Sequence, residues 1–169
     1  KKLLNKAIKL NPDSSISHFN LGNLLIDLGN LHEAELSTCK AIELNPDFVS
    51  AHLNLGSILY GLGNEQEAEI SYRKAIELKP DSPEAHSLLG GMLKDFGRLK
   101  EAELSIRKAI ELKPDYAPAY YNLGSILKDF GRLQEAEINL RKAIEINADY
   151  LSAYTSLGKV LKDIDELPS

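Results

Sequence analysis

The sequence predicts an all-α fold, a solenoid built from antiparallel helix pairs, and two recurring dipeptides in its 169 residues carry this prediction. A proline-aspartate pair returns every 34 residues, and a leucine-glycine pair returns with the same period inside each unit. A fixed period of about 20–50 residues is the signature of proteins whose units bury their apolar faces against their neighbours. The dipeptides are Pro12-Asp13, Pro46-Asp47, Pro80-Asp81 and Pro114-Asp115, and Leu21-Gly22, Leu55-Gly56, Leu89-Gly90, Leu123-Gly124 and Leu157-Gly158.

Other glycines and prolines mark where the helices of each unit begin and end. One set of glycines lies between two helical patterns, a place that suits a left-handed residue ending a helix. Pro83 and Pro118 fall in the first turn of a following helix, where proline is tolerated. Asp81, with Glu84 three residues later, predicts a capping box. The glycines between the helices are Gly29, Gly63, Gly97 and Gly131.

These signals describe residues 1–169 as one solenoid with four complete repeats and a partial repeat at each end, ten helices in all. Both ends fall inside a unit and the first residue is not methionine, so we expect a fragment of a longer array. The complete repeats are residues 15–48, 49–82, 83–116 and 117–150; residues 1–14 hold the second helix of a partial repeat, and residues 151–169 hold a first helix and a tail.

Composition excludes several classes of function. The chain has 20 basic and 25 acidic residues and a pI near 5.4, whereas a nucleic-acid binder or a polybasic membrane-surface module needs a basic face. No apolar run approaches the ~18 residues of a membrane span, and no signal peptide follows Lys1 and Lys2, so we expect no membrane insertion. The single cysteine, Cys39, excludes an internal disulfide and is compatible with a cytoplasmic location, which we predict.

The repeating columns resemble the tetratricopeptide repeat (TPR) family over essentially the whole chain. The motif Tyr121-Asn122-Leu123-Gly124 is similar to the motifs of bacterial arrays, notably cyanobacterial ones, and of the arrays of O-linked N-acetylglucosamine transferases. This resemblance implies a right-handed superhelix, a concave face formed mostly by first helices, and a protein or peptide partner. The chain departs from the family at two large aromatic positions, which read His18, His52, His86, Tyr120 and Tyr154, and Thr38, Tyr72, Ile106 and Leu140.

The resemblance places one column of asparagines on the concave face, interrupted by Leu88 and Ser156. An asparagine side chain both donates and accepts hydrogen bonds, so it can bind a peptide backbone in either direction. In the transferase arrays such a ladder holds extended peptides. The alternative is that these side chains brace the neighbouring repeat. The column contains Asn20, Asn54 and Asn122.

Two further columns supply apolar and basic side chains. The lysines could grip an acidic segment, but an aspartate follows each of them, so a solvated and charge-balanced face is the alternative. Asn23 and Asn54 match parts of the family's carboxylate clamp, but its basic members are missing, so we do not expect binding of chaperone tails. The predicted peptide-binding groove comprises Phe19, Asn20, Asn23, Leu53, Asn54, Tyr60, Lys94, Tyr121, Asn122 and Lys128.

The sequence predicts no catalytic residue, no metal and no cofactor. Ser37-x-x-Lys40 matches a short acyl-enzyme pattern, but the match recurs in phase with the repeat and its partner motifs are absent. The histidine column cannot converge on a metal, because packed helices lie ~8–10 Å apart and zinc ligands lie about 2 Å from the ion. Paired glutamates such as Glu33 and Glu35 recur at helix starts, where they favour the helix dipole. Cys39 has no histidine placed as its base.

The primary interpretation is therefore a non-catalytic protein-interaction scaffold that binds an extended or helical peptide in the concave groove. One alternative is a substrate-presenting appendage of a larger enzyme of glycosyltransferase or sulfotransferase type. The other is a structural spacer that self-associates end to end, through Leu4 and Ile8 at one end and Val160 and Leu161 at the other.

Overall fold

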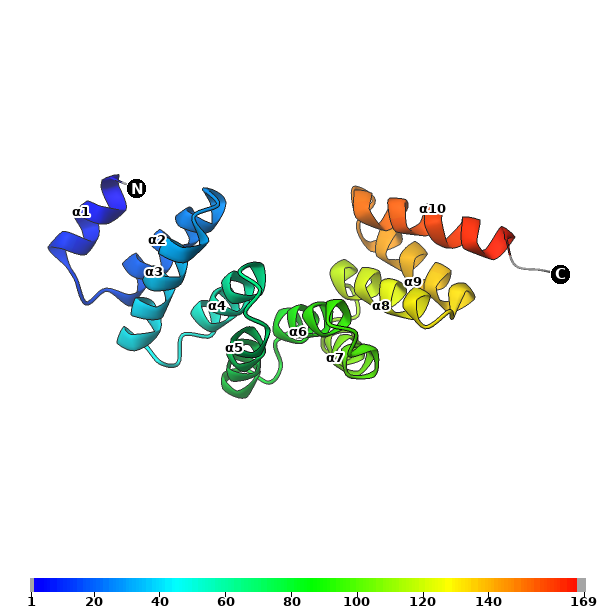
Figure 1. Ribbon diagram of the computed structural model, residues 1–169, viewed down its shortest axis with the longest axis horizontal. Coiled ribbons are helices and arrows are strands. Elements are labelled where there is room, and N and C mark those ends of the chain that lie inside the picture. The colour runs from blue at the N-terminus through cyan, green and yellow to red at the C-terminus, as the bar shows by residue number, and fades with distance from the viewer. Residues whose placement is uncertain (1, 167–169) are drawn as a thin grey trace. The chain divides into compact units, whose positions relative to one another are not determined.

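The computed structural model describes residues 2–166, and within that range it contains ten α-helices and no strand (Figure 1). The predicted all-α architecture is confirmed. The helices are α1 (Lys2–Leu10), α2 (Ser15–Asp27), α3 (Leu31–Leu44), α4 (Val49–Gly61), α5 (Glu65–Leu78), α6 (Pro83–Asp95), α7 (Leu99–Leu112), α8 (Ala117–Asp129), α9 (Leu133–Ile146) and α10 (Leu151–Asp165).

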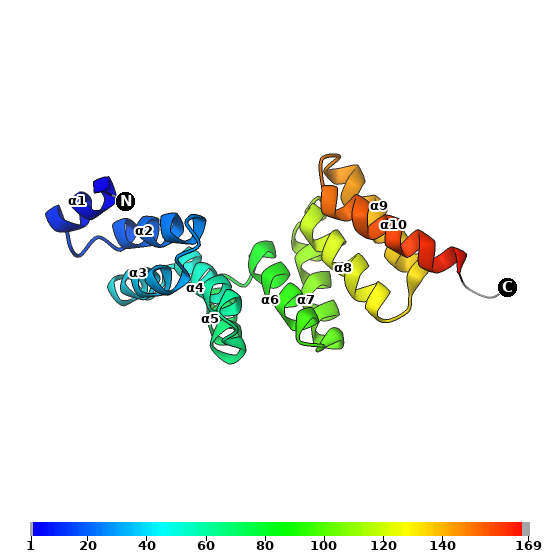
Figure 2. The same ribbon diagram turned by 45° about the horizontal axis from the view of Figure 1, so that its top comes forward.

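The helices group into two compact units, Lys1–Pro80 and Asp81–Ser169. In the first unit α2 pairs with α3 and α4 with α5, while α1 packs on α2. In the second unit α6 pairs with α7 and α8 with α9, and α10 packs on α9 (Figure 2). The helices α2, α4, α6, α8 and α10 are called first helices below, and α3, α5, α7 and α9 second helices.

A glycine in the left-handed conformation ends each complete first helix, as predicted. Gly29, Gly63, Gly97 and Gly131 have φ angles of 73° to 81°. At the first of these turns the amide of Gly29 bonds the carbonyl of Ile26 at 2.9 Å, and the amide of Asn30 bonds the carbonyl of Leu25 at 2.8 Å. This pair of bonds is the Schellman arrangement, which satisfies carbonyls that the helix leaves unpaired.

The start of α6 differs from the predicted capping box. Ser82, not Asp81, is the N-cap residue, and its hydroxyl accepts a hydrogen bond from the amide of Ala85 at 3.3 Å. The difference arises because Pro83 fits the first helical position, which leaves the preceding serine to cap the helix. Asp81 lies one residue too early to cap the helix.

In each complete repeat, the glycine of the leucine-glycine pair lets the two helices approach closely. A Cβ atom at Gly56 would lie 2.7 Å from the ring of Tyr72, and one at Gly124 would lie 2.7 Å from Cγ of Leu140. Each second-helix side chain that lies over a glycine is fully or almost fully buried, as are the alanines beside the contact. These side chains are Thr38, Tyr72, Ile106 and Leu140, and the alanines include Ala34, Ala68, Ala102 and Ala136.

In three repeats, the polar aromatic residue three places before the leucine-glycine pair ties the preceding turn to its helix, and His18, His52 and Tyr120 have this role. His52 donates from Nε2 to the carbonyl of Pro46 at 2.8 Å, and Tyr120 donates from its hydroxyl to the carbonyl of Pro114 at 3.1 Å. A carbonyl only accepts hydrogen bonds, so Nε2 of His52 carries the proton. The departure from a purely apolar aromatic thus supplies a donor for a turn carbonyl.

Alanine substitution at Gly124 and at Gly158 tests the close helix approach. Gly124→Ala should lower the free energy of unfolding by about 1–3 kcal/mol, because the new methyl group overlaps Leu140. At Gly158 no atom lies within 4 Å of the position that a Cβ would take, so Gly158→Ala should leave stability unchanged or raise it by up to about 1 kcal/mol through helix propensity. Urea denaturation followed by circular dichroism measures both, and equal effects would contradict the packing account.

Candidate functional site

The ten predicted groove residues are divided between the two units, and each unit presents its own first-helix face. In the first unit α2 and α4 carry them, and in the second unit α6 and α8 do. The term first-helix face is used below for these residues in either unit. Their exposure differs widely, from Asn20, which is exposed, to Leu53, which is 6% exposed.

In the first unit, an asparagine of α4 braces the preceding repeat. The Nδ2 group of Asn54 donates a hydrogen bond to Oδ1 of Asn23 on α2. Both side chains are half-buried, whereas Asn20 is exposed. Asn54 therefore braces the neighbouring repeat, which is the alternative to a ladder that binds peptide, and each amide retains other donor and acceptor positions.

In the second unit the same column makes a different bond. Asn122 donates from Nδ2 to the hydroxyl of Ser87, at 3.3 Å. Gly91 stands two repeats after Asn23 in the same column and offers no side chain, so Asn122 reaches Ser87 instead. Asn54 and Asn122 both brace the preceding repeat, and the residue that accepts the hydrogen bond depends on the sequence of that repeat.

Aromatic side chains of the first-helix faces are held by ring contacts. Phe19 lies against Phe48, with ring centroids 4.7 Å apart, and Tyr121 lies against Tyr150 at 5.2 Å. Burial, with the neighbouring Tyr121 and Tyr116, raises the pKa of Tyr150, so its phenol stays neutral at physiological pH. Each contact joins a residue of a first helix to the residue immediately before the next first helix. These contacts restrict the rotamers of Phe19 and Tyr121.

Two other apolar side chains of the faces behave differently from each other. Leu53 lies in the core, so it supports the face from below and contributes little exposed surface. Tyr60 is 37% exposed and is the more accessible apolar group of the first unit's face.

Both predicted lysines have a carboxylate partner. Nζ of Lys94 lies 2.9 Å from Asp95, and Nζ of Lys128 lies 3.6 Å from Asp163 on α10. Their side chains are 27% and 34% exposed. The charges of both lysines are therefore balanced. The longer ion pair, between Lys128 and Asp163, joins consecutive first helices of the second unit.

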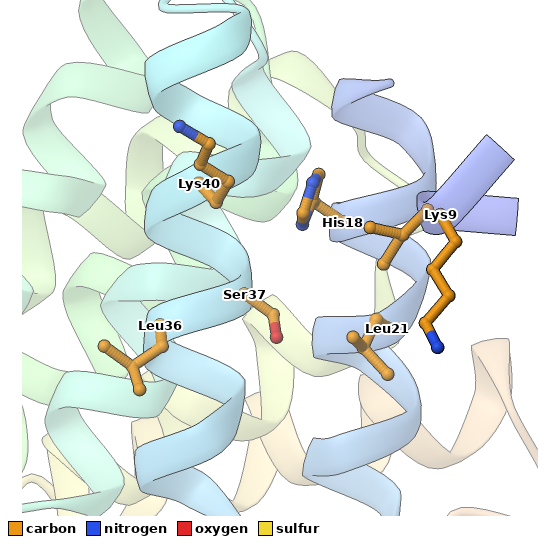
Figure 3. A pocket seen from close by; sticks show the side chains of 7 residues that line it. Lys9, His18, Leu21, Leu36, Ser37 and Lys40 are labelled. Carbon is orange, nitrogen blue, oxygen red and sulfur yellow. The ribbon is translucent and has the colours of Figure 1, made fainter. Parts of the chain in front are cut away.

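A cavity of about 440 Å³ lies between α1, α2 and α3, away from the predicted groove residues (Figure 3). His18, Ser37 and Lys40 line it, but each is engaged elsewhere. Nε2 of His18 bonds the carbonyl of Pro12 at 3.0 Å, the hydroxyl of Ser37 donates to the carbonyl of Glu33 at 3.0 Å, and Lys40 pairs with Glu43 at 2.7 Å. These partners do not form a nucleophile-base pair.

The recurring serine of the Ser-x-x-Lys pattern has a structural role. Ser71 donates to the carbonyl of Glu67 at 2.9 Å, as Ser37 does to Glu33. In the fourth repeat Asn139 makes the same bond to the carbonyl of Glu135, at 2.8 Å. In these three repeats, the side chain at this position bonds back to its own helix.

Cys39 is half-buried on α3. Its burial and the negative charges of Glu35 and Glu43 raise the pKa of the thiol, which disfavours the reactive thiolate. Among residues 2–166 no group of three or more histidine, cysteine or acidic side chains is arranged to hold a metal ion. None of the helices in that range has the length and apolar character that a bilayer span requires.

The predicted end-to-end contact needs one correction. Val160 is completely buried where α10 packs on the preceding pair, so it is not part of an exposed end. Leu4, Ile8 and Leu161 are half-buried.

Comparison with known families identifies the repeat. A tetratricopeptide repeat model matches residues 49–82, 83–116 and 117–150, and a second model of the same description matches residues 3–35. The chain belongs to the tetratricopeptide repeat family. No curated protein sequence matches this TPR chain significantly.

Several solved structures resemble it over most of its length. MamA is 27% identical, with a TM-score of 0.72 over 85% of this chain and 84% of MamA. YrrB, described as a TPR protein with an unusual peptide-binding site, is 24% identical, with a TM-score of 0.72 over 96% of this chain and 84% of YrrB. TTC0263, a TPR protein of Thermus thermophilus, is 21% identical, with a TM-score of 0.81 over 95% of this chain and 88% of that protein. The last two likenesses, below 25% identity, concern the fold alone.

The bracing role of Asn54 predicts a loss of stability on its removal. Asn54→Ala should lower the free energy of unfolding of the first unit by about 0.5–1.5 kcal/mol, because it breaks the bond to Asn23. Asn20→Ala, at an exposed position on the neighbouring helix, should change it by less than about 0.5 kcal/mol. Thermal or urea unfolding provides the measurement, and an unchanged stability of the Asn54 variant would exclude the brace.

The surroundings of Cys39 predict that its thiol reacts slowly with thiol reagents. At pH 8 the folded chain should react with a maleimide or a disulfide reagent several-fold more slowly than the urea-unfolded chain, since burial and two glutamates raise the pKa of the thiol. A folded-state rate equal to the unfolded one would show that the thiol is neither shielded nor shifted.

Proposed function

We propose that this TPR chain is a non-catalytic scaffold that binds an extended or helical peptide on its first-helix faces. TPR proteins generally bind proteins or peptides, and the neighbour YrrB is described as having a peptide-binding site. The observation that carries the proposal is the mixture of exposed and fixed side chains on α2 and α4. Asn20 is exposed and Tyr60 is 37% exposed, and Asn23, Asn54 and Phe19 are held by bonds or ring contacts.

This arrangement suits a peptide for two physical reasons. Side chains that are already fixed lose little conformational entropy when a ligand binds, so more of the interaction energy appears as affinity. An accessible asparagine can bond the amide or the carbonyl of a peptide backbone, and a tyrosine on the next first helix supplies apolar area with a polar end. In the second unit, Asn122 occupies the column of Asn20, and Lys94 and Lys128 occupy the column of Tyr60, where they add positive groups.

A peptide-display selection on the whole chain tests this proposal. Selected peptides should bind the Asn20→Ala/Tyr60→Ala variant at least about tenfold more weakly, since two contacts of ordinary strength are lost. Asn20 is exposed and Tyr60 is 37% exposed, and circular dichroism of the variant checks that its helical fold is kept.

The matched control is Gln66→Ala/Ile70→Ala on the second helix α5. It also removes one exposed amide and one exposed apolar side chain, and Ile70 is 68% exposed. Binding to this variant should be unchanged. Equal losses in the two variants, or no enrichment by a folded monomer, would contradict the proposal and favour the appendage or spacer interpretation.

A further inference from the structure

A small polar cavity opens on the first-helix face of the second unit. Its volume is about 130 Å³, and it lies among α8, α9 and α10 with one side chain from α6. Since a water molecule occupies about 30 Å³ of the liquid, the cavity has room for a group the size of roughly four waters. We call it the lysine-serine pocket, and its polar lining consists of Lys94, Ser125, Lys128, Asp129, Ser156 and Lys159.

One difference between repeats accounts for the space beside Ser125 in this pocket. In the second repeat, the hydroxyl of Tyr72 meets the hydroxyl of Ser57 at 3.0 Å, and Ser57 also donates to the carbonyl of Leu53 at 3.1 Å. Two repeats later Leu140 and Ser125 occupy the same positions. A leucine lacks the ring and hydroxyl of tyrosine, so space remains beside Ser125, whose hydroxyl bonds no other side chain or carbonyl in residues 2–166.

Three ammonium groups from consecutive first helices line the pocket. Lys94 and Lys128 have aspartate partners, and Lys159 has no ion pair with another residue of the described chain. Asp129 also lines the pocket. A ligand carboxylate carries a single negative charge, so it would offer the lysines no more than the aspartates already do. A doubly charged oxyanion brings more charge and more acceptor oxygens to the three ammonium groups and two hydroxyls.

We propose that the lysine-serine pocket binds a phosphoryl group carried by the peptide ligand, an inference that rests on the proposed peptide-binding function. A phosphorylated side chain has a charge of about −1.5 to −2 at pH 7 and three acceptor oxygens. The lysines supply positive charge and the hydroxyls of Ser125 and Ser156 donate to the oxygens. Gly124, Leu140 and Val160 form the apolar floor that confines the group.

Titration of the whole chain with inorganic phosphate, followed by NMR at the amides of Ser125 and Ser156, tests the pocket without any peptide. The shifts should saturate, and Lys159→Ala should weaken the binding by about tenfold, the usual size of a lost charge-assisted contact. The control is Lys162→Ala on the same helix. It removes the same charge, but this side chain is 74% exposed, pairs with Glu166 at 3.4 Å and does not line the pocket, so the affinity should be unchanged.

Three results would contradict phosphate binding in the pocket. A titration without saturation would exclude the pocket, and equal losses in the Lys159 and Lys162 variants would show only general attraction to positive charge. Acetate binding as tightly as phosphate at equal ionic strength would assign the pocket to carboxylates. Because the probe is inorganic phosphate, saturable binding without any peptide enrichment would instead contradict the proposed peptide-binding function, and with it the peptide source of the phosphoryl group.

Discussion

Contact between a glycine on one helix and a buried side chain on the next sets the geometry of every complete repeat. Gly56 leaves no room for a Cβ beside Tyr72, and Gly124 leaves none beside Leu140. The two helices of a pair are thereby brought close enough to bury the alanines between them. Since this contact fixes which side of each first helix faces its partner, it also fixes which side remains for the next repeat and for a ligand.

The residues left on the first-helix faces combine structural and surface roles. Asn54 and Asn122 brace the preceding repeat, and their bonds hold consecutive first helices in place. On the first-helix face of the first unit, Asn20 is exposed and Tyr60 is 37% exposed. The same face therefore contributes to the stability of the array and presents an ordered set of polar and apolar groups, which is the basis of the proposed scaffold function.

The sequence was sufficient for the fold class because the 34-residue period, the left-handed glycines and the prolines of the first turns are all local signals. It could not decide the role of the asparagines, because the partner of each depends on the residue of the preceding repeat, Asn23 in one case and Ser87 in the other. The burial of Leu53 and Val160 likewise follows from packing between helices. The lysine-serine pocket was missed, although the replacement of Tyr72 by Leu140 in one column was a visible signal for it.

The central claim is that ligands bind on the first helices, and a spin-labelled peptide from the display selection tests it most directly. The label broadens NMR signals of amides that lie near it in the complex. The account predicts broadening on α2 and α4, or on α6, α8 and α10, with the second helices far less affected. Broadening centred on the outer surfaces of α3, α5, α7 or α9, where Ile70 and Ile138 are exposed, would contradict it.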